Sequence, residues 1–421
     1  MGYLMALLKE LISVDEAIRR IVSTFRLDLR TTYVNIENSL GLISAEDVVA
    51  PYDIPSYNKS VVDGYALRAK DTYGASPSNP VELKVIGEVD VNVDPEEVPS
   101  LKPFTAVKVA TGSPLPKGSD AVIMYEDVEH LNDKILVYKP LPQWANVARI
   151  GEDFRGGDLI VSKGTVLGPW HIASLASYGF SKVLVYERIK VAVIPIGSEV
   201  IKPSMPKPLR KGVYDSTSYL IKSFLSIKGY FNVSRLDPIP DDLSIIKSII
   251  SKALESFDIV ITCGGTSVGE RDLTYSAIKD LGDFIPLFRG VAIRPGRPVS
   301  AALAGGKLVF MVSGFPVAAL ATLDLILMPS IKLVLGVKEV DEPVVKAKLV
   351  KRLVNVVGYT SYFRVRVFRC GSELCVEPLR LTGSGILSTL IRGNGVVIIP
   401  PNVEGYDVGT YVKVKLIGPI L

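Results

Sequence analysis

Glycines, hydroxyls and an acid follow an apolar run of this sequence at the point where the run ends. The run Ile259–Cys263 is followed by GGTSVGERD, residues 264–272, which ends on Asp272. Glycines allow a ligand to approach the backbone closely, and amides at a helix start attract phosphate. The pattern favours a phosphate site, and a tight strand-to-helix turn capped by Asp272 is the alternative. The residues assigned to this site are Gly264, Gly265, Thr266, Ser267 and Gly269.

A second acidic turn, Ile239-Pro-Asp-Asp242, follows the predicted strand 231–236. In a parallel sheet this connection and the glycine segment lie at the same edge. Asp241 or Asp242 could cap the helix that follows. Two carboxylates beside a phosphate could instead form a magnesium site, and Asp272 could hold a cation beside the same phosphate. Two solvated helix caps would account for the same residues equally well.

Two arginines lie on a turn that is stiffened by prolines, Arg294-Pro-Gly-Arg297-Pro298. Paired guanidinium groups on such a turn can bind an oxyanion bidentately with little loss of freedom. A surface turn with solvated arginines is the alternative. The segment Ser313-Gly-Phe-Pro316 also ends a predicted strand and begins a helix, which places it at the same sheet edge.

The composition limits the chemistry that is open to these residues. The 421-residue chain has 48 basic and 44 acidic residues and a net charge of +4, which makes no case for nucleic acid binding. The chain has only two histidines, so it lacks the residues for most zinc sites and for Ser-His catalysis. Three cysteines predict no disulfide framework and a reducing compartment. Without a signal-peptide pattern or a long apolar run, we expect a cytoplasmic protein that does not bind membranes.

The site residues must be positioned by an α/β region that begins at residue 187. Apolar strands alternate there with helices, which predicts a parallel-rich sheet covered on both faces and ligands bound beyond the carboxyl ends of its strands. The predicted strands are 191–196, 231–236, 259–263 and 308–312, and the predicted helices are 216–228, 243–256, 273–281 and 316–335. The connection 197–214 is long enough to be either functional or mobile.

The flanking regions carry the remaining predicted elements. A capping box at Ser13 and Glu16 predicts a helix over 14–25. Short β-like runs between turns predict a β-rich second domain and a small β-barrel-like C-terminal domain. Their strands are 81–89, 106–110, 121–125 and 135–138, then 344–349, 361–368, 396–399 and 411–416. The expected domains are 1–50 with 143–186 (mixed), 51–142 (β-rich), 187–336 (α/β) and 337–421 (barrel-like).

Nine segments follow one another in a characteristic order along the chain. They are PSYNKSVVDGYA, TGSPLPKGSDAVIMYED, PIGSEV, YDSTSYL, IPDD, DIVITCGGTSVGERD, IRPGRP, GFPVAAL and GSGILSTLIRGNG. Together they resemble the molybdopterin molybdenumtransferase family, known as MoeA in bacteria and as the gephyrin E domain in animals. The resemblance covers nearly the whole chain. It implies an L-shaped subunit of four domains, with a molybdopterin-binding third domain, in a homodimer whose subunits share each active site.

The resemblance also implies a reaction and roles for single residues. The reaction inserts molybdate, or tungstate, into adenylated molybdopterin with Mg²⁺-dependent release of AMP. The implied partners are a molybdopterin adenylyltransferase, which supplies the substrate, and acceptor molybdo- or tungsto-enzymes, which take the product. The implied catalytic residues are Asp63, Glu199, Asp241 and Asp272, of which Asp241 and Asp272 would also bind the metal. The implied substrate-binding residues, besides the glycine segment, are Thr111, Glu126, Asp215, Ser216 and Pro298. The implied molybdate-binding residues are Arg294, Arg297, Arg364 and Ser384.

The sequence departs from the family pattern around the expected anion pocket. Arg294 and Arg297 replace the lysines of the family's KPGKP turn, and the family's PGNPVS segment is Ser313-Gly-Phe-Pro-Val-Ala318 here. Phe315 and Ala318 motivate an alternative function, a non-catalytic paralogue that stores molybdopterin or hands it on. A scaffold that binds receptor peptides, as the animal relative does, is a third hypothesis, although no additional linker or domain is visible.

Overall fold

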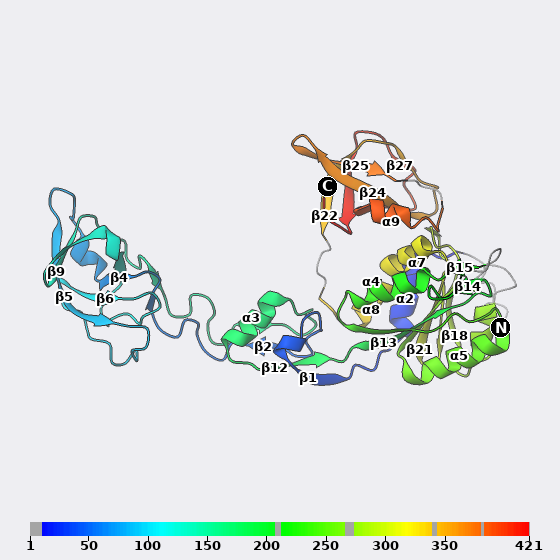
Figure 1. Ribbon diagram of the computed structural model, residues 1–421, viewed down its shortest axis with the longest axis horizontal. Helices are drawn as coiled ribbons and strands as arrows, with labels where there is room; N and C mark the ends of the chain where they lie inside the picture. The colour runs from blue at the N-terminus through cyan, green and yellow to red at the C-terminus, as the bar shows by residue number, and fades with distance from the viewer. Residues whose placement is uncertain (1–10, 207–211, 266–272, 339–342, 380–382, 421) are drawn as a thin grey trace. The chain divides into compact units, whose positions relative to one another are not determined.

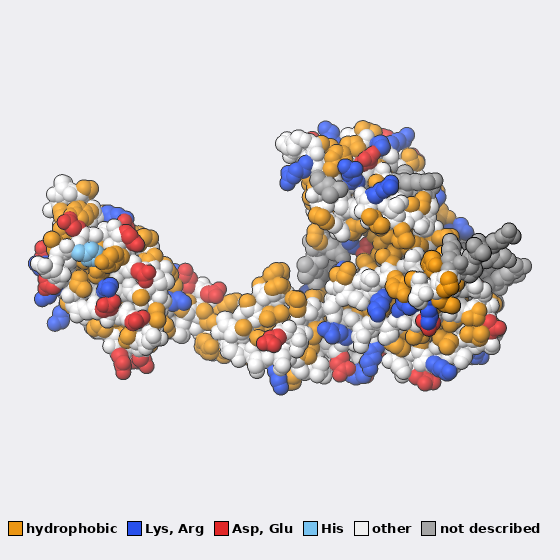
Figure 2. Space-filling view, in the orientation of Figure 1, with side chains coloured by type: hydrophobic (Ala, Val, Ile, Leu, Met, Phe, Trp, Pro, Cys, Tyr) orange, Lys and Arg blue, Asp and Glu red, His pale blue; other side chains and the backbone are white. Residues whose placement is uncertain are grey.

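The computed structural model of the chain describes residues 11–206, 212–265, 273–338, 343–379 and 383–420. The chain folds into two compact units, which are drawn in Figure 1. Unit 1 comprises residues 1–46, 163–172 and 181–421, and unit 2 comprises residues 47–162 and 173–180. On the face drawn in Figure 2, acidic and basic side chains are interspersed on both units, in keeping with the small net charge of +4.

A six-stranded sheet forms the centre of unit 1. Its strands are, in spatial order, β16 (Phe231–Arg235), β13 (Ile189–Pro195), β17 (Ile259–Cys263), β21 (Lys307–Val312), β20 (Ser300–Ala304) and β18 (Ile285–Arg289). The first four are parallel to one another, which confirms the parallel-rich sheet. The other two run antiparallel, and sequence analysis did not predict them. Gly305 and Gly306, both at positive φ, form the tight turn that returns the chain from β20 to β21.

Helices cover both faces of this sheet, as predicted (Figure 1). Neighbouring residues of a strand point to opposite faces, so Val193 of β13 packs in one core and Ile194 in the other. The first core includes residues of α2 (Val14–Thr24), α4 (Thr217–Ser226), α7 (Pro316–Thr322) and α8 (Met328–Val334). The second includes residues of α5 (Leu243–Ser256) and α6 (Leu273–Lys279).

The first helix begins as the capping pattern predicts. Ser13 Oγ accepts a hydrogen bond from the backbone N–H of Glu16 at 3.1 Å. The Glu16 carboxylate does not complete the box, because it pairs with Arg20, at 2.7 Å, and with Arg19. The hydrogen bond from Arg20 holds the pKa of Glu16 below its ordinary value.

The predicted helix 316–335 is a continuous helical run that widens in the middle. A π-helical turn, Leu323–Leu327, lies between α7 and α8. By length and composition, Pro316–Val334 could cross a membrane, but 72% of it is buried inside the protein. No other helix among the described residues passes this test. Such burial is typical of a core helix of a globular domain.

The C-terminal part of unit 1 is a small closed barrel, which confirms the predicted domain. Its strands β24 (Thr360–Cys370), β25 (Glu373–Pro378), β22 (Val344–Leu349), β28 (Tyr411–Leu416) and β26 (Gly395–Ile399) pair in this order, and β26 pairs again with β24. β19 (Ile293–Arg294), from the arginine turn, joins the edge of β24. The other short elements of unit 1 are β1 (Thr31–Asn35) with β12 (Lys182–Tyr186), β14 (Val200–Ile201) with β15 (Val213–Tyr214), β23 (Leu353–Val354) with β27 (Gly405–Tyr406), and α9 (Ser388–Arg392).

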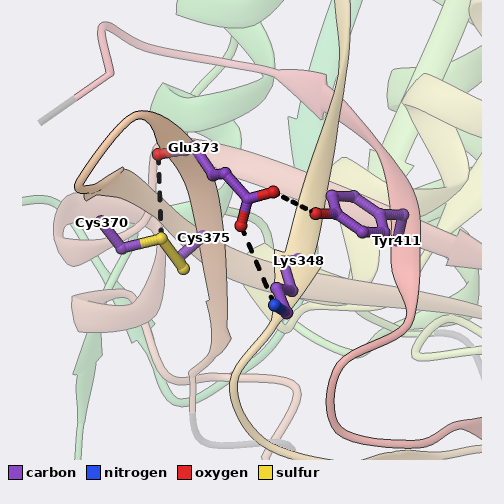
Figure 3. The surroundings of a disulfide bond; sticks show 5 residues. All are labelled: Lys348, Cys370, Glu373, Cys375 and Tyr411. Atoms are coloured by element: carbon purple, nitrogen blue, oxygen red, sulfur yellow. Dashed lines mark hydrogen bonds and ion pairs between the residues drawn. A yellow bond between two sulfur atoms is a disulfide. The ribbon is translucent and has the colours of Figure 1, made fainter.

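A disulfide joins Cys370 to Cys375 across the β24–β25 hairpin (Figure 3). The expectation from the sparse cysteine count missed this bond. The hairpin brings the two Cα atoms to 5.8 Å, which is within the usual range for a disulfide, and a count of cysteines carries no such geometry. Beside it, the Glu373 carboxylate accepts a hydrogen bond from Tyr411 and pairs with Lys348. The remaining cysteine, Cys263, is free and buried, and burial raises the pKa of its thiol.

Unit 2 is built on a second six-stranded sheet, which confirms the β-rich prediction. Its spatial order is β7 (Ala121–Met124), β4 (Gly64–Leu67), β6 (Thr105–Val109), β5 (Val81–Val89), β9 (Lys134–Val137) and β8 (Val128–Leu131). Fully buried Leu67, Leu83 and Ile123 lie in its core. Two short strand pairs complete the unit, β2 (Val48–Val49) with β11 (Leu159–Val161) and β3 (Lys59–Ser60) with β10 (Val147–Ala148), and α3 (Pro169–Ser177) contributes its C-terminal half.

Candidate functional site

Three arginines from distant parts of the sequence line one cavity of unit 1. The cavity has a volume of about 960 Å³ and lies where the arginine turn, the end of β21 and the barrel strand β24 meet. All four predicted molybdate ligands line it, together with Pro298; they are Arg294, Arg297, Arg364 and Ser384. We call it the arginine cavity. Its guanidinium groups make it suited to an oxyanion.

Arg364 is the buried arginine of this cavity. The residue is 3% exposed, and burial lowers the pKa of its guanidinium group. Arg364 Nε donates to Thr389 Oγ1 at 3.2 Å, and Nη1 donates to the carbonyl oxygen of Tyr362 at 3.3 Å. Arg294 is exposed and lies 5.9 Å from the centroid of the Tyr359 ring. The cavity therefore combines one fixed, desolvated cation with more accessible ones.

A second cavity of about 440 Å³ is lined by acidic residues at the carboxyl edge of the parallel strands. We call it the carboxylate cavity. Six predicted site residues line it: Glu199, Asp215, Ser216, Asp241, Gly264 and Gly265. The IPDD turn and the glycines that follow β17 lie at the same edge of the sheet, which confirms this prediction.

The two neighbouring aspartates of the IPDD turn have separate roles in the structure. Asp242 caps α5, since its Oδ1 accepts the backbone N–H groups of Ser244 at 2.9 Å and Ile245 at 3.0 Å. The hydrogen bond from the Ser244 hydroxyl is the main cause that lowers the pKa of Asp242. Asp241 instead lines the carboxylate cavity and accepts the N–H of Ser198 through Oδ2 at 2.9 Å. Of the two, Asp241 is the one that lines the cavity.

Gly264 lies too close to the end of the neighbouring strand for any side chain. Its φ is +96°, and a Cβ atom at this position would collide with the carbonyl oxygen of Ile196. A Cβ atom at Gly265, where φ is +64°, would lie 2.6 Å from Thr274 Oγ1. The fold itself therefore needs both glycines, as the alternative of a tight strand-to-helix turn expects, and their contact with a ligand stays a prediction. The other assigned residues of the segment lie outside the described residues; they are Thr266, Ser267, Gly269 and Asp272.

Asp215 lines the carboxylate cavity, but the carboxylate is engaged by its own surroundings. It accepts the backbone N–H of Ser218 at 3.0 Å, the Ser218 hydroxyl, and Arg235 Nη1 at 3.4 Å. Arg235 in turn lies 4.3 Å from the centroid of the Tyr219 ring. Asp215 therefore fixes the start of α4 and leaves Glu199 and Asp241 as the cavity's more available acids. Sequence analysis did not find this network, because it depends on side chains from two different elements.

The remaining predicted residues lie in unit 2, where Asp63 and Thr111 form a bonded pair. Asp63 Oδ1 accepts the backbone N–H of Thr111 at 2.8 Å and its hydroxyl at 3.2 Å. The carbonyl oxygen of Asp63 accepts the N–H of Tyr125, next to Glu126, at 3.1 Å. All three predicted residues are exposed. They form a small polar surface on a β-sheet rim.

An aromatic cluster adjoins this surface and was missed from the sequence. The Tyr125 and His130 rings lie 4.5 Å apart, and Tyr65 Oη lies 3.2 Å from His130 Nδ1. Burial raises the pKa of the Tyr65 hydroxyl. The cluster joins residues of β4, β8 and the turn before β8, so only the folded sheet brings the rings together.

Comparison with family models divides the chain into three matched regions. Residues 12–179 match "MoeA N-terminal region (domain I and II)", residues 192–333 match "Probable molybdopterin binding domain", and residues 346–417 match "MoeA C-terminal region (domain IV)". The two cavities described above are lined from the second and third regions, and the Asp63–Thr111 pair lies in the first.

Relatives of known name span almost the whole chain. The molybdopterin molybdenumtransferase of Staphylococcus aureus is 34% identical over 406 residues, which cover 96% of this chain and 95% of that protein. The molybdopterin molybdenumtransferase of Staphylococcus epidermidis is 32% identical over 408 residues, with coverage of 96% and 95%. The crystal structure of the molybdopterin biosynthesis moeA protein from Pyrococcus horikoshii OT3 superposes with a TM-score of 0.81 at 32% identity, over 97% of this chain and 100% of that one.

Proposed function

Because this chain belongs to the MoeA family of molybdenumtransferases of molybdenum cofactor biosynthesis, we propose that it inserts molybdate or tungstate into adenylated molybdopterin and releases AMP. The observation that carries this proposal is the convergence of Arg294, Arg297 and Arg364 on one cavity beside a carboxylate-lined one. The proposal assigns the metal oxyanion to the first cavity and the phosphate-bearing part of the pterin substrate to the second.

The arginine cavity fits the oxyanion substrate. Molybdate is a tetrahedral dianion, and guanidinium groups bind such oxygens with charge-assisted hydrogen bonds. Arg364 is held in place by Thr389 and Tyr362, so little of its freedom would be lost on binding. Ser384 also lines the cavity and carries a hydroxyl group. The roles proposed for these residues are binding and orientation of the oxyanion.

The carboxylate cavity fits a magnesium ion that accompanies a phosphate. Mg²⁺ is usually held by one or two carboxylates together with substrate phosphates, and Glu199 and Asp241 supply two carboxylates on the wall of one cavity. The residues proposed to hold it are Asp241 and Asp272, the latter outside the described residues, with Glu199 alongside. When bound, the ion neutralises charge that develops on the phosphate oxygens. Among the described residues no group of three or more potential metal ligands is assembled, and Asp272 lies outside them.

Unit 2 is proposed to act on the neighbouring subunit of a homodimer. Asp63 and Thr111 form an exposed polar pair, so both side chains are accessible to a second protein surface. The family resemblance supports an arrangement in which the partner subunit's Asp63, Thr111 and Glu126 complete the site on unit 1. A molybdopterin adenylyltransferase would supply the substrate, and acceptor molybdo- or tungsto-enzymes would take the product.

The reaction can be tested directly. The purified protein is incubated with adenylated molybdopterin, Mg²⁺ and molybdate or tungstate, and AMP is quantified over time. We expect oxyanion-dependent AMP release that falls when Mg²⁺ is chelated. Absence of AMP release with every oxyanion and divalent metal tried would reject the proposed reaction.

A second candidate function is a paralogue that binds molybdopterin without turnover. Phe315 and Ala318 favour it, because they place apolar side chains on the arginine cavity wall. Calorimetry with molybdopterin separates the two functions. The storage function requires binding that survives Asp272→Asn and no AMP release by the wild-type protein, whereas the transferase requires turnover that Asp272→Asn abolishes.

A further inference from the structure

Phe315 lies at the junction of the two cavities. It lines the arginine cavity and the carboxylate cavity, as Ser313 also does, and the residue is 58% exposed. Single exposed hydrophobic side chains are common on protein surfaces, so exposure alone does not distinguish this ring. Its place on the walls of both cavities makes it a feature of the site.

The position of the ring is set by the strand end and by the barrel. The backbone N–H of Phe315 donates to Ser313 Oγ at 3.3 Å, and Pro316 begins α7 immediately after it. The ring lies against Gly385 of the barrel, because a Cβ atom at Gly385 would lie 3.1 Å from Phe315 Cδ1. Nearby, the N–H of Val317 donates to the carbonyl oxygen of Ser384 at 3.0 Å. Contacts from two sides thus hold an aromatic ring at a mostly open position.

The two cavities that meet at this ring have complementary chemistry. One is lined by guanidinium groups and the other by carboxylates. Under the proposed function the first takes the oxyanion and the second takes a phosphate with its cation. An aromatic ring at the junction suits the face of a planar ring, because stacking of planar rings adds affinity beyond the burial of area.

We propose that Phe315 is a specificity-determining residue that stacks on the face of one planar heterocycle of the substrate at the junction of the arginine cavity and the carboxylate cavity. This proposal rests on the proposed function for the identity of the substrate. Both the pterin and the adenine of adenylated molybdopterin are planar heterocycles, and the ring of Phe315 would recognise the face of either. Phe315 would favour ligands with a planar ring, and the arginines would bind the oxyanion.

Binding measurements with matched ligands test this role without requiring turnover. Dissociation constants are measured by calorimetry for molybdopterin, AMP, ribose 5-phosphate and molybdate, with the wild type, Phe315→Leu and Phe315→Trp. We expect Phe315→Leu to weaken molybdopterin or AMP about tenfold, because ring stacking is worth roughly that factor, and Phe315→Trp to retain affinity. Ribose 5-phosphate and molybdate, which lack a heterocycle, should bind all three proteins equally. The ligand whose affinity falls, molybdopterin or AMP, shows whether the pterin or the adenine stacks on Phe315.

A second variant tests the position of the ring without removing it. Gly385→Ala adds a methyl group against Phe315 Cδ1 and should weaken the same ligand, by less than Phe315→Leu does, while molybdate binding stays unchanged. Equal affinity of Phe315→Leu and wild type for both heterocyclic ligands would overturn the proposal, as would a wild type that binds neither. Oxyanion-dependent AMP release by Phe315→Leu with unaltered ligand affinities would reject the role of Phe315 and leave the proposed function standing.

Discussion

Arg364 differs from the other arginines of the cavity in being buried and fixed. Its guanidinium is bonded to Thr389 and to the Tyr362 carbonyl, and burial disfavours its charge, as the lowered pKa shows. A buried cation of this kind gains most from an anion brought next to it, because the surrounding medium screens little. At the residue scale, the strongest oxyanion contact is therefore expected at Arg364.

Substitution of Arg364 by lysine tests this expectation. Arg364→Lys retains the charge but loses the planar fork, so the affinity for molybdate should fall by roughly tenfold or more. Arg366→Lys on the same strand is the matched control, because Arg366 is exposed. Calorimetry with molybdate gives both values. Equal affinities for the two variants would remove Arg364 from the oxyanion site.

The neighbouring acids Asp241 and Asp242 allow function to be separated from stability. Asp241→Asn should reduce AMP release at least a hundredfold with little change in melting temperature, since the side chain lines the cavity and caps no helix. Asp242→Ala removes the cap of α5 and should lower the melting temperature while largely preserving AMP release. The assignment fails if Asp242→Ala is the inactive variant.

The Asp242 variant also carries a pH signature. The pKa of Asp242 is lowered below its ordinary value of 3.8 by hydrogen bonds in the folded state. A lowered carboxylate pKa means that the stabilisation is present above the ordinary pKa and is lost as the pH falls through the folded-state value. The difference in melting temperature between wild type and Asp242→Ala should therefore be constant above about pH 5 and shrink towards lower pH.

At the scale of elements, the π-helical turn between α7 and α8 ties the α/β domain to the barrel. Asp324 of this turn is 8% exposed and accepts a hydrogen bond from the Tyr362 hydroxyl at 3.2 Å. Its other carboxylate oxygen lies 2.6 Å from Lys415 Nζ of β28. Tyr362 lines the arginine cavity two residues before Arg364. The turn thus fixes the barrel strand that carries the buried arginine.

Removal of the Asp324 carboxylate should destabilise the protein unless the Lys415 charge is removed as well. Asp324→Leu removes the carboxylate that pairs with Lys415 and accepts from Tyr362, and should lower the free energy of unfolding by about 3–5 kcal/mol. Adding Lys415→Met should recover most of that loss, because the pair is replaced by apolar groups. Urea denaturation of the single and double variants measures both effects. A double variant less stable than Asp324→Leu alone would contradict this role.

Sequence patterns predicted the elements better than the contacts between them. The strand Ile259–Cys263 and the helix Leu243–Ser256 were predicted to the residue, because apolar runs and a capping acid mark them locally. The antiparallel strands β18 and β20 and the disulfide were missed, because both depend on where the chain returns in space. The choice between Asp241 and Asp242 as cap was left open for the same reason.

At the scale of the whole molecule, the proposed homodimer predicts complementation between inactive variants. Asp63→Asn changes unit 2 and Arg364→Ala changes unit 1, so each variant alone should release little AMP. If the subunits share each site, a mixed dimer has one site with both changes and one with neither. An equimolar mixture that exchanges subunits should then recover about a quarter of wild-type activity. No recovery in a mixture shown to form mixed dimers would mean that each chain forms its site alone.

The central claim is that the arginine cavity is the oxyanion site, and anomalous diffraction from crystals soaked in tungstate tests it most directly. We predict one strong tungsten peak within hydrogen-bonding distance of Arg364 and of at least one of Arg294 and Arg297. The same peak should disappear in crystals of Arg364→Ala soaked under the same conditions. A tungsten peak elsewhere, with none in the arginine cavity, would contradict the account.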